Sequence, residues 1–224
     1  MITANFIHRT FRIAYLDRSG TGFVVDVDGR HYMVTARHVV DGFPEQGNLE
    51  IYAAGTWNKL AARLVGHANN DVDVTVLAPD IQLCATDLPV TVASKDIAYG
   101  QDVYFLGFPY GNLSKLMIGD KGYPLPLVKK GVMSAFAGQE FLVDAHGNSG
   151  FSGGPLLFAP GGLGLPTAIA AVVTDVNTWD EPVLDGEEPS GLIFRENTGI
   201  MSTVMIEVAL EIVRQNPIGH VAVY

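Results

Sequence analysis

The sequence predicts an all-β protein in which two small β-barrels pack together and a helix follows at the C-terminus. Short runs of alternating apolar and polar residues recur along most of the chain, and this is the pattern of half-buried strands. The 224 residues include 25 glycines and 12 prolines, a density of turn formers that suits many short strands better than a helical bundle. Hydrophobic residues make up 48% and charged residues 17%, as expected of a chain that folds around a core.

The first half of the chain is predicted to form an N-terminal barrel over residues 1–80. Its clearest element is a hairpin in which strands 22–27 and 30–35 flank Asp28-Gly29, a dipeptide typical of tight hairpin turns. Further alternating or apolar runs predict the other strands of this unit at 6–13, 49–53, 58–65 and 73–78.

A polar, proline-containing stretch at 81–99 is predicted to link this unit to a C-terminal barrel over residues 100–202. Residues 203–214 then carry apolar side chains at helical spacing, with Ser202 or Thr203 as the expected cap and Asn216-Pro217 as a stop. The strands of the second barrel are predicted at 102–107, 127–136, 140–144, 155–158, 167–176 and 191–201.

Charge and cysteine content exclude several functions. The formal net charge of −10 repels phosphate backbones and anionic lipids, so neither nucleic acid nor a membrane surface is an expected partner. Cys84 is the single cysteine, which excludes an internal disulfide framework and a cysteine-rich zinc site. Residues 26–29 lack the ligands of a calcium loop, and no metal or cofactor is expected. The first residues do not read as a secretory signal and no run is long enough to span a membrane, so a cytoplasmic location is expected if Met1 is the natural start.

The most informative segment is Gly-Phe-Ser-Gly-Gly-Pro at 150–155. A serine among glycines lets the backbone approach a substrate carbonyl with its N–H groups turned toward one point, as an oxyanion hole requires. A serine nucleophile also needs an imidazole base and an orienting carboxylate. His38 at the end of a predicted strand and an aspartate before residues 74–77 supply both, in the chain order His, Asp, Ser of chymotrypsin-type enzymes.

These segments resemble the motifs of trypsin-like serine proteases, and most closely those of the Deg/HtrA-type protease domain. The resemblance covers residues 5–214 and implies two six-stranded antiparallel barrels. It also implies a serine endopeptidase that forms an acyl-enzyme on Ser152, with a His38–Asp73 relay, an oxyanion hole from the N–H groups of Gly150 and Ser152, and an extended polypeptide as substrate. The segments that carry it are 19–23, 34–39 and 73–77 in the first barrel and 99–111, 130–135 and 144–156 in the second.

Asp73 is preferred over Asp71 because Asp-Val-Thr-Val-Leu at 73–77 is similar to the family motif, although alternation places both carboxylates on one face. Two positions depart from the family pattern. Phe151 stands where an acidic or amide residue usually precedes the serine, so activation by a new N-terminus is not expected. Arg37 stands before His38, where the family has a small residue, and it is expected to point toward solvent.

The resemblance also suggests where the substrate binds. His146 lies six residues before Ser152, at the place of the pocket-floor residue, so a strong preference for Arg or Lys is not expected and a small side chain would fit. Residues 172–176 resemble the strand that pairs with the substrate backbone, with Val176 in that strand and Thr174 as a support for the triad aspartate. The acidic stretch 180–188 is expected to be a loop near this pocket.

Other interpretations remain beside the protease. Ser149 mimics the nucleophile, but only Ser152 precedes Gly-Gly-Pro. An α/β-hydrolase elbow fails because the only histidine after Ser152 is His220. A catalytically silent or latent module that requires a regulatory protein partner is the alternative, and Phe151 and Arg37 are the features that favour it. Only ten residues follow Arg214, so no PDZ-like domain is expected.

Overall fold

Two closed six-stranded barrels form the body of the protein, which confirms the predicted fold class. The structure is a computed structural model, and it describes residues 2–69, 72–85, 89–111, 117–118, 122–160 and 167–222. In the first barrel the strands follow the order β3-β2-β1-β4-β5-β6, and a β3–β6 pairing closes the ring. These strands are β1 (Thr10–Tyr15), β2 (Arg18–Val27), β3 (Arg30–Thr35), β4 (Gln46–Ala53), β5 (Thr56–His67) and β6 (Thr75–Pro79), and β16 (His220–Val221) adds to the edge of β3.

The second barrel follows the order β13-β8-β11-β12-β15-β14, and a β13–β14 pairing closes it. The short strand β7 (Thr91–Val92) lies parallel to β14, and β9 (Met117–Ile118) pairs with β10 (Tyr123–Pro124) outside both barrels. The barrel strands are β8 (Asp102–Gly107), β11 (Leu127–Ala137), β12 (Glu140–Asp144), β13 (Pro155–Phe158), β14 (Ala168–Asp185) and β15 (Glu188–Met205).

The predicted Asp28-Gly29 turn is confirmed, because both residues have positive φ, 48° and 73°, as a tight turn between two twisted strands requires. The predicted strand at 6–13 is wrong in its first half. Helix α1 (Ala4–His8) occupies this position, and the Thr10 hydroxyl donates to the carbonyl of Phe6 at its end. A segment this short has too few residues for its apolar and polar pattern to distinguish a helical turn from a strand. Phe6 would be buried in either structure.

The C-terminal helix α2 (Ile206–Gln215) begins three residues later than predicted. Neither Ser202 nor Thr203 caps it, because both still belong to β15, where the Thr203 hydroxyl donates to the carbonyl of Phe141. Glu207 in the first turn instead accepts hydrogen bonds from the backbone N–H and the hydroxyl of Ser94, at 2.9 and 2.7 Å. The helix therefore holds the segment that connects the barrels. Within the described residues, no helix has the length and apolar character needed to cross a membrane.

One hydrophobic core joins the barrels and the helix. It contains Phe23 and Val34 from the first barrel, Leu157 and Val172 from the second, and Ile206 from α2, all almost completely buried. Burial of these side chains at a shared interface fixes the barrels relative to each other, and the cleft between them is where the candidate site lies.

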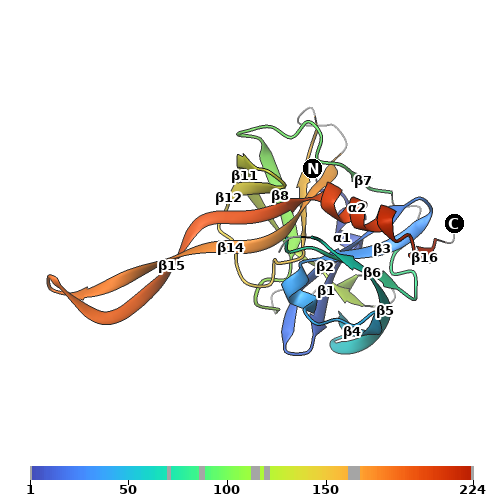
Figure 1. The fold of residues 1–224 in the computed structure, drawn as a ribbon, viewed down its shortest axis with the longest axis horizontal. Coiled ribbons are helices and arrows are strands. Elements are labelled where there is room, and N and C mark those ends of the chain that lie inside the picture. Colours follow the sequence, from blue (N-terminus) through green and yellow to red (C-terminus); the bar gives the residue numbers. More distant parts are fainter. Residues whose placement is uncertain are drawn as a thin grey trace.

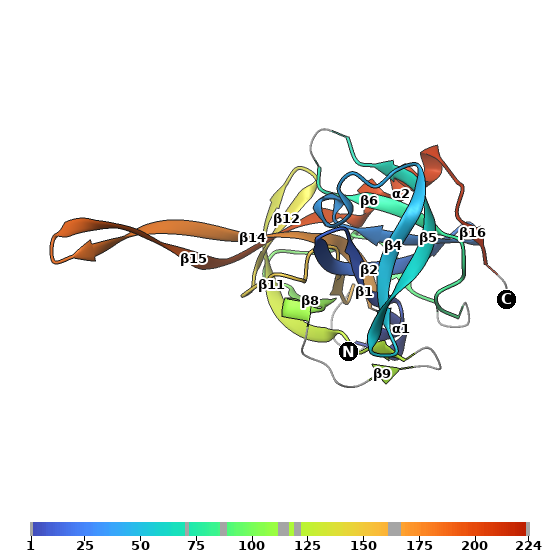
Figure 2. The same ribbon diagram turned by 90° about the horizontal axis from the view of Figure 1, so that it is seen from below.

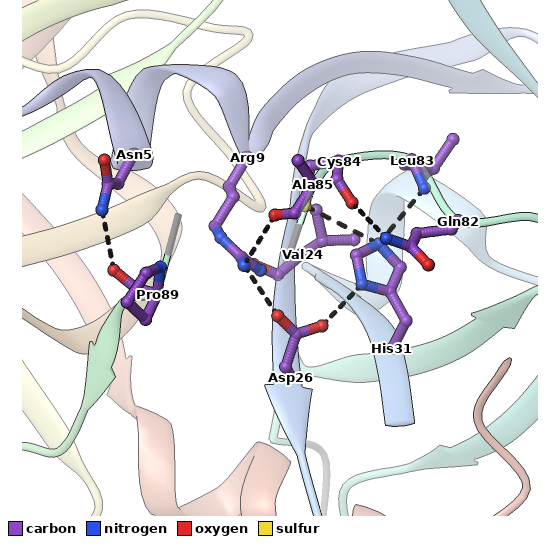
Figure 3. Close-up of polar contacts among 10 residues, drawn as sticks. All are labelled: Asn5, Arg9, Val24, Asp26, His31, Gln82, Leu83, Cys84, Ala85 and Pro89. Atoms are coloured by element: carbon purple, nitrogen blue, oxygen red, sulfur yellow. Dashed lines mark hydrogen bonds and ion pairs between the residues drawn. The ribbon is translucent and has the colours of Figure 1, made fainter. Parts of the chain in front are cut away.

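A buried polar cluster of Arg9, Asp26 and His31 attaches the connecting segment to the first barrel (Figure 3). The Arg9 guanidinium, 1% exposed, donates to the Asp26 carboxylate at 2.7 Å and to the carbonyl of Ala85 at 3.4 Å. His31 Nδ1 donates to the other Asp26 oxygen at 2.7 Å, while Nε2 accepts the backbone N–H of Leu83. Asp26 thus satisfies two buried partners at once, and the start of the connecting segment lies against both of them.

Two strands extend far beyond the second barrel. Figures 1 and 2 show β14 and β15 leaving the body as a long two-stranded arm. The expected loop at 180–188 is therefore wrong, since both strands continue almost to a turn at Gly186. Its acidic composition indicated a loop because the arm is exposed along most of its length. Cross-strand contacts such as the Asp180–Arg195 ion pair, 2.7 Å, support it.

Candidate active site between the two barrels

Two paired strands of the first barrel bring His38 and Asp73 together. Strands β3 and β6 are neighbours, with Thr35 opposite Thr75. His38 follows β3 in the short helix η1 (Arg37–Val40), and Asp73 lies two residues before β6. His38 Nδ1 donates to Asp73 Oδ2 at 2.6 Å, and the backbone N–H of His38 donates to Oδ1 at 2.8 Å. This arrangement fixes the ring orientation and leaves Nε2 as the nitrogen with a free lone pair. Asp71 lies outside the described residues.

The segment between β12 and β13 carries Ser152. Gly150 has φ of +103°, a backbone conformation that favours glycine. Gly153 is also at positive φ, and a methyl group there would collide with the carbonyl of Thr21 and the hydroxyl of Thr35. Within the described chain, the backbone N–H groups of Gly150 and Ser152 donate no hydrogen bond to another backbone group. Both donors are therefore available to a ligand beside the serine.

Phe151 anchors this segment to the second barrel. Its side chain is completely buried and packs edge-on against Phe105, with ring centroids 4.9 Å apart. The residue that departs from the family pattern is thus a core residue, and it contributes packing where an acid would have contributed charge.

Thr21 of the first barrel binds the backbone of the segment that carries Ser152. Its backbone N–H donates to the carbonyl of Ser152 at 2.9 Å. Its hydroxyl donates to the carbonyl of Gly150 at 2.7 Å and accepts the backbone N–H of Phe108 at 3.2 Å. Because Thr21 is buried, no solvent competes for these bonds. Thr21 therefore sets the orientation of the peptide group next to the expected oxyanion donors.

We expect Thr21→Val to lower kcat for peptide cleavage by about tenfold to a hundredfold, with KM little changed. The methyl group fills the same space, but Gly150 loses the partner that orients it, and small displacements in such a site are costly. Thr21→Ser keeps the hydroxyl and should restore most of the rate. Steady-state kinetics with a matched thermal melt would check this, and a loss in Thr21→Ser with a wild-type rate in Thr21→Val would show that the methyl group rather than the hydroxyl matters.

A cavity of about 460 Å³ contains the candidate residues of both barrels. His38 enters it from the first barrel and Ser152 from the second, although no hydrogen bond joins their side chains in the part of the chain that the structure describes. Catalytic hydrogen bonds are often long before substrate binds. The other lining residues are Tyr110, His146, Gly147, Asn148, Ser149, Asp175, Val176, Thr178 and Asn197.

The side of this cavity below Ser152 is narrow. A methyl group at Gly147 would come within 2.5 Å of Val176 Cγ2, so the Val176 side chain packs directly against this backbone. Asn197 Nδ2 donates to the carbonyl of Gly147 at 2.8 Å and closes the same end. Lys129 reaches the segment from β11, where its ammonium donates to the carbonyl of His146 and to Asn148 Oδ1, and burial lowers its pKa. Val176 and Gly147 thus form one wall of the cavity, and the Lys129 ammonium lies against the same segment.

The predicted substrate residues occupy different places. His146 and Val176 line the cavity with Ser152, as expected. Thr174 lines an adjacent cavity with His38 and Asp73, but its hydroxyl donates to the carbonyl of Ser202 at 3.0 Å. The described hydrogen bond of Thr174 is thus to Ser202, and Asp73 accepts a hydrogen bond from the backbone N–H of His38, while the supporting role of Thr174 stays a prediction.

Nearby charges set the protonation of His38. The hydrogen bond to Asp73 raises the pKa of His38, burial opposes this rise, and the negative charges of Asp73 and Asp175 add to it. The opposing cation is Arg18, which also donates to the carbonyl of His38 at 2.9 Å. Arg37 acts on another residue, His67, whose pKa is lowered first by burial and then by the charge of Arg37. The net effect is a pKa for His38 above its ordinary value.

We expect Asp175→Asn to shift the acid limb of the kcat/KM profile to lower pH. A general base works only when unprotonated, so activity rises as pH passes the pKa of His38, and removing a nearby negative charge lowers that pKa. Asp102→Asn, at an exposed ion pair with Lys130, is the control and should leave the limb in place. A limb that does not move in Asp175→Asn would mean that another group controls it.

Comparison with known proteins agrees with this geometry. The sequence profile of the trypsin-like peptidase domain matches residues 20–163. The chain is 36% identical over 159 residues to "Protease Do-like 1, chloroplastic" of Arabidopsis thaliana, a match that covers 67% of this chain and 33% of that protein. The chain thus spans about a third of the length of this relative.

Two solved structures share the fold. The serine endoprotease from Yersinia pestis has a TM-score of 0.59 at 21% identity, over 95% of this chain and 64% of that one. An inactive form of Rv3671c from M. tuberculosis has a TM-score of 0.56 at 20% identity, over 96% and 89%. The paired barrels and the matching trypsin-like peptidase profile define the class of serine-type endopeptidase domains. The chain belongs to the trypsin-like peptidases, in their Deg/HtrA-type branch.

Proposed function

We propose that the chain is an active serine endopeptidase that cleaves extended polypeptides, with Ser152, His38 and Asp73 as its catalytic residues. The observation that carries this proposal is the His38 ring, which a 2.6 Å hydrogen bond from Nδ1 to Asp73 orients in the cavity that also contains Ser152. A serine and an imidazole that share a cavity, together with a carboxylate that orients the imidazole, are the parts that acyl transfer needs.

In the proposed reaction, Ser152 Oγ attacks the scissile carbonyl carbon while its proton passes to His38 Nε2. The electron pair of the carbonyl moves to oxygen, where the N–H groups of Gly150 and Ser152 stabilise the negative charge. Collapse of this intermediate expels the amine, which takes the proton from His38, and leaves an ester on Ser152. Water then attacks the ester, gives a proton to His38, and releases the carboxylic acid as Ser152 recovers its proton.

The backbone of β14 supports extended binding. Asp175, Val176 and Thr178 of this strand line the cavity, and β13 pairs with β14 only as far as Val172. The strand edge beside Ser152 is therefore open to a substrate backbone, which can pair with it as an added strand with little demand on its sequence.

A fluorophosphonate probe tests the proposal, because it phosphonylates only an activated serine. We expect one label per chain, located on Ser152 by mass spectrometry and lost in Ser152→Ala and His38→Ala. An unlabelled, fully folded chain would favour a silent or partner-dependent module. A label that appears only after a regulatory protein is added would identify a latent enzyme. The cytoplasmic location stays a prediction, which fractionation of the source cells would test.

Val176→Gly is expected to broaden the specificity of cleavage. Removing the side chain that packs against Gly147 opens the narrow end of the cavity, so kcat/KM for a large apolar residue before the scissile bond should rise by roughly tenfold or more. Cleavage after alanine should change little. A peptide library read out by mass spectrometry compares the two enzymes, and a wild-type profile dominated by Arg or Lys would contradict the small, neutral pocket.

A further inference from the structure

The arm formed by residues 178–197 of β14 and β15 has more exposed apolar surface than a solvated hairpin needs. Trp179 is 62% exposed, and Leu192, Ile193 and Phe194 are 67%, 68% and 61% exposed. Large apolar side chains gathered on one projecting element are typical of an interaction surface. Figure 2 shows the arm as a twisted ribbon far from the body, so no part of the described chain covers its end.

One face of the arm alternates aromatic residues with carboxylates. Trp179 lies opposite Glu196, and Glu181 lies opposite Phe194. Directly opposed residues share a face, and so do alternate residues of one strand. Trp179, Glu181, Phe194 and Glu196 therefore form one surface, called here the aromatic–acidic face. Such a surface suits a partner that offers apolar side chains and cations in alternation.

The charge of the arm also favours a partner that carries cations. Residues 178–197 contain six acidic residues and one basic residue, Arg195, which pairs with Asp180. A second copy of the chain, with a net charge of −10, would be repelled, whereas a basic segment would be attracted.

The arm is also continuous with the cleft. Beyond Val173, one edge of β14 has no neighbouring strand in the described residues, and the same edge borders the cavity at Asp175 and Val176. In serine proteases the residue whose carbonyl is attacked places its side chain in the pocket beside the nucleophile, so the residues before it lie along β14. From Thr178 to Asp185 the strand extends about 25 Å, enough for roughly seven further residues.

We propose that the arm is a docking site for the substrate segment on the amino-terminal side of the scissile bond, and that basic and apolar residues alternate at every second position of this segment. The substrate backbone pairs with the open edge of β14, and its side chains contact the aromatic–acidic face. The direction of the bound chain rests on the proposed function, while the docking itself rests on the arm alone.

Peptide substrates of three designs test the proposal. A core peptide spans only the cleft, a second carries the eight residues Lys-Ser-Val-Ser-Lys-Ser-Val-Ser before the core, and a third carries the same eight residues after it. We expect kcat/KM of the second to exceed that of the core by about tenfold or more at low salt and to fall as salt rises, while the third behaves like the core.

Variants on the arm make the test specific. Trp179→Ser with Phe194→Ser should remove the advantage of the second peptide and leave cleavage of the core unchanged. Glu181→Lys with Glu196→Lys should transfer the advantage to a peptide with Glu in place of Lys. Ile193→Ser, equally exposed and on the opposite face, is the matched control and should behave as wild type. No gain for the second peptide, or the same gain in all variants, would overturn the proposal.

Binding separates this proposal from the proposed function. Anisotropy of the labelled eight-residue extension on Ser152→Ala needs no catalysis. Binding that the Trp179 and Phe194 substitutions abolish would support the docking site even if no serine labelled. Efficient cleavage of the core peptide without any binding of the extension would overturn the docking site and leave the protease standing.

Discussion

Ser152→Ala is expected to reduce peptide cleavage by roughly 10⁴-fold to 10⁶-fold, the largest effect of any single substitution in the chain. Without the hydroxyl no acyl-enzyme forms, and the remaining rate comes from the oxyanion donors and substrate binding. His38→Ala should cost about as much, because the proton of Ser152 then has no acceptor. Asp73→Asn should cost somewhat less, since its carboxylate orients the ring through the 2.6 Å hydrogen bond and takes no part in bond formation.

Ser149→Ala is the matched control for this loss. Ser149 lies in the same cavity, three residues from Ser152, and its side chain is exposed. The Ser149→Ala variant should cleave a fluorogenic peptide at the wild-type rate. The melting temperature should be unchanged in this variant and in the three variants of the preceding paragraph. Wild-type turnover in Ser152→Ala, or loss of turnover in Ser149→Ala, would show that the nucleophile has been assigned to the wrong serine.

Asp26→Asn is expected to destabilise the fold by roughly 3 kcal/mol, because it removes the negative charge that both the buried Arg9 guanidinium and the buried His31 ring contact at 2.7 Å. The melting temperature should fall by about 6–12 °C in a chain of this length. Asp102→Asn removes one side of an ion pair that is exposed on both sides, and it should change the melt little. Coincident melting of Asp26→Asn and wild type would show that solvent replaces Asp26.

The same carboxylate predicts how stability depends on pH. Burial raises the pKa of Asp26, but hydrogen bonds and charge from His31 and Arg9 outweigh it, so the pKa in the folded protein lies below the ordinary value of 3.8. The unfolded chain therefore binds this proton first. Asp26 stabilises the fold fully above the unfolded pKa, and this contribution is lost as pH falls below about 4 through the folded value. Denaturant titrations between pH 3 and 7 should show this acid loss in wild type and much less of it in Asp26→Asn.

Local sequence was sufficient for the parts of the site that motifs encode. His38 and Ser152 lie beside glycines or at strand ends where few other residues fit, and their flanking segments identify them without a structure. The structure brings them into one cavity with Asp73 beside His38. Their catalytic roles stay predictions. The two-barrel fold was predictable for the same reason, since the alternating runs and the Asp28-Gly29 turn are local signals.

Long-range contacts explain what the sequence could not predict. Thr21 acts through a hydrogen bond to Gly150, 129 residues away, and no local pattern marks such a partner. Lys129 reaches the pocket segment from a strand whose other residues alternate normally. Asp175 follows directly after a buried strand segment, and its effect on His38 depends on how the barrels pack. Motifs and periodicity depend on residues that are close together in the sequence, whereas these contacts join residues that are far apart in the sequence.

The hydrogen bonds of Thr21 also determine when, during folding, the chain becomes able to cut. They join the second strand of the first barrel to the nucleophile segment of the second, and the shared core around them includes Ile206 of the final helix. Contacts across such sequence separations form late, after the entropy of closing a long loop has been overcome. A chain that emerges from the ribosome in N-terminal order would thus assemble the segment around Ser152 only after the residues through Ile206 have been synthesised. Nascent chains that end before Ile206 would therefore be unable to cut one another.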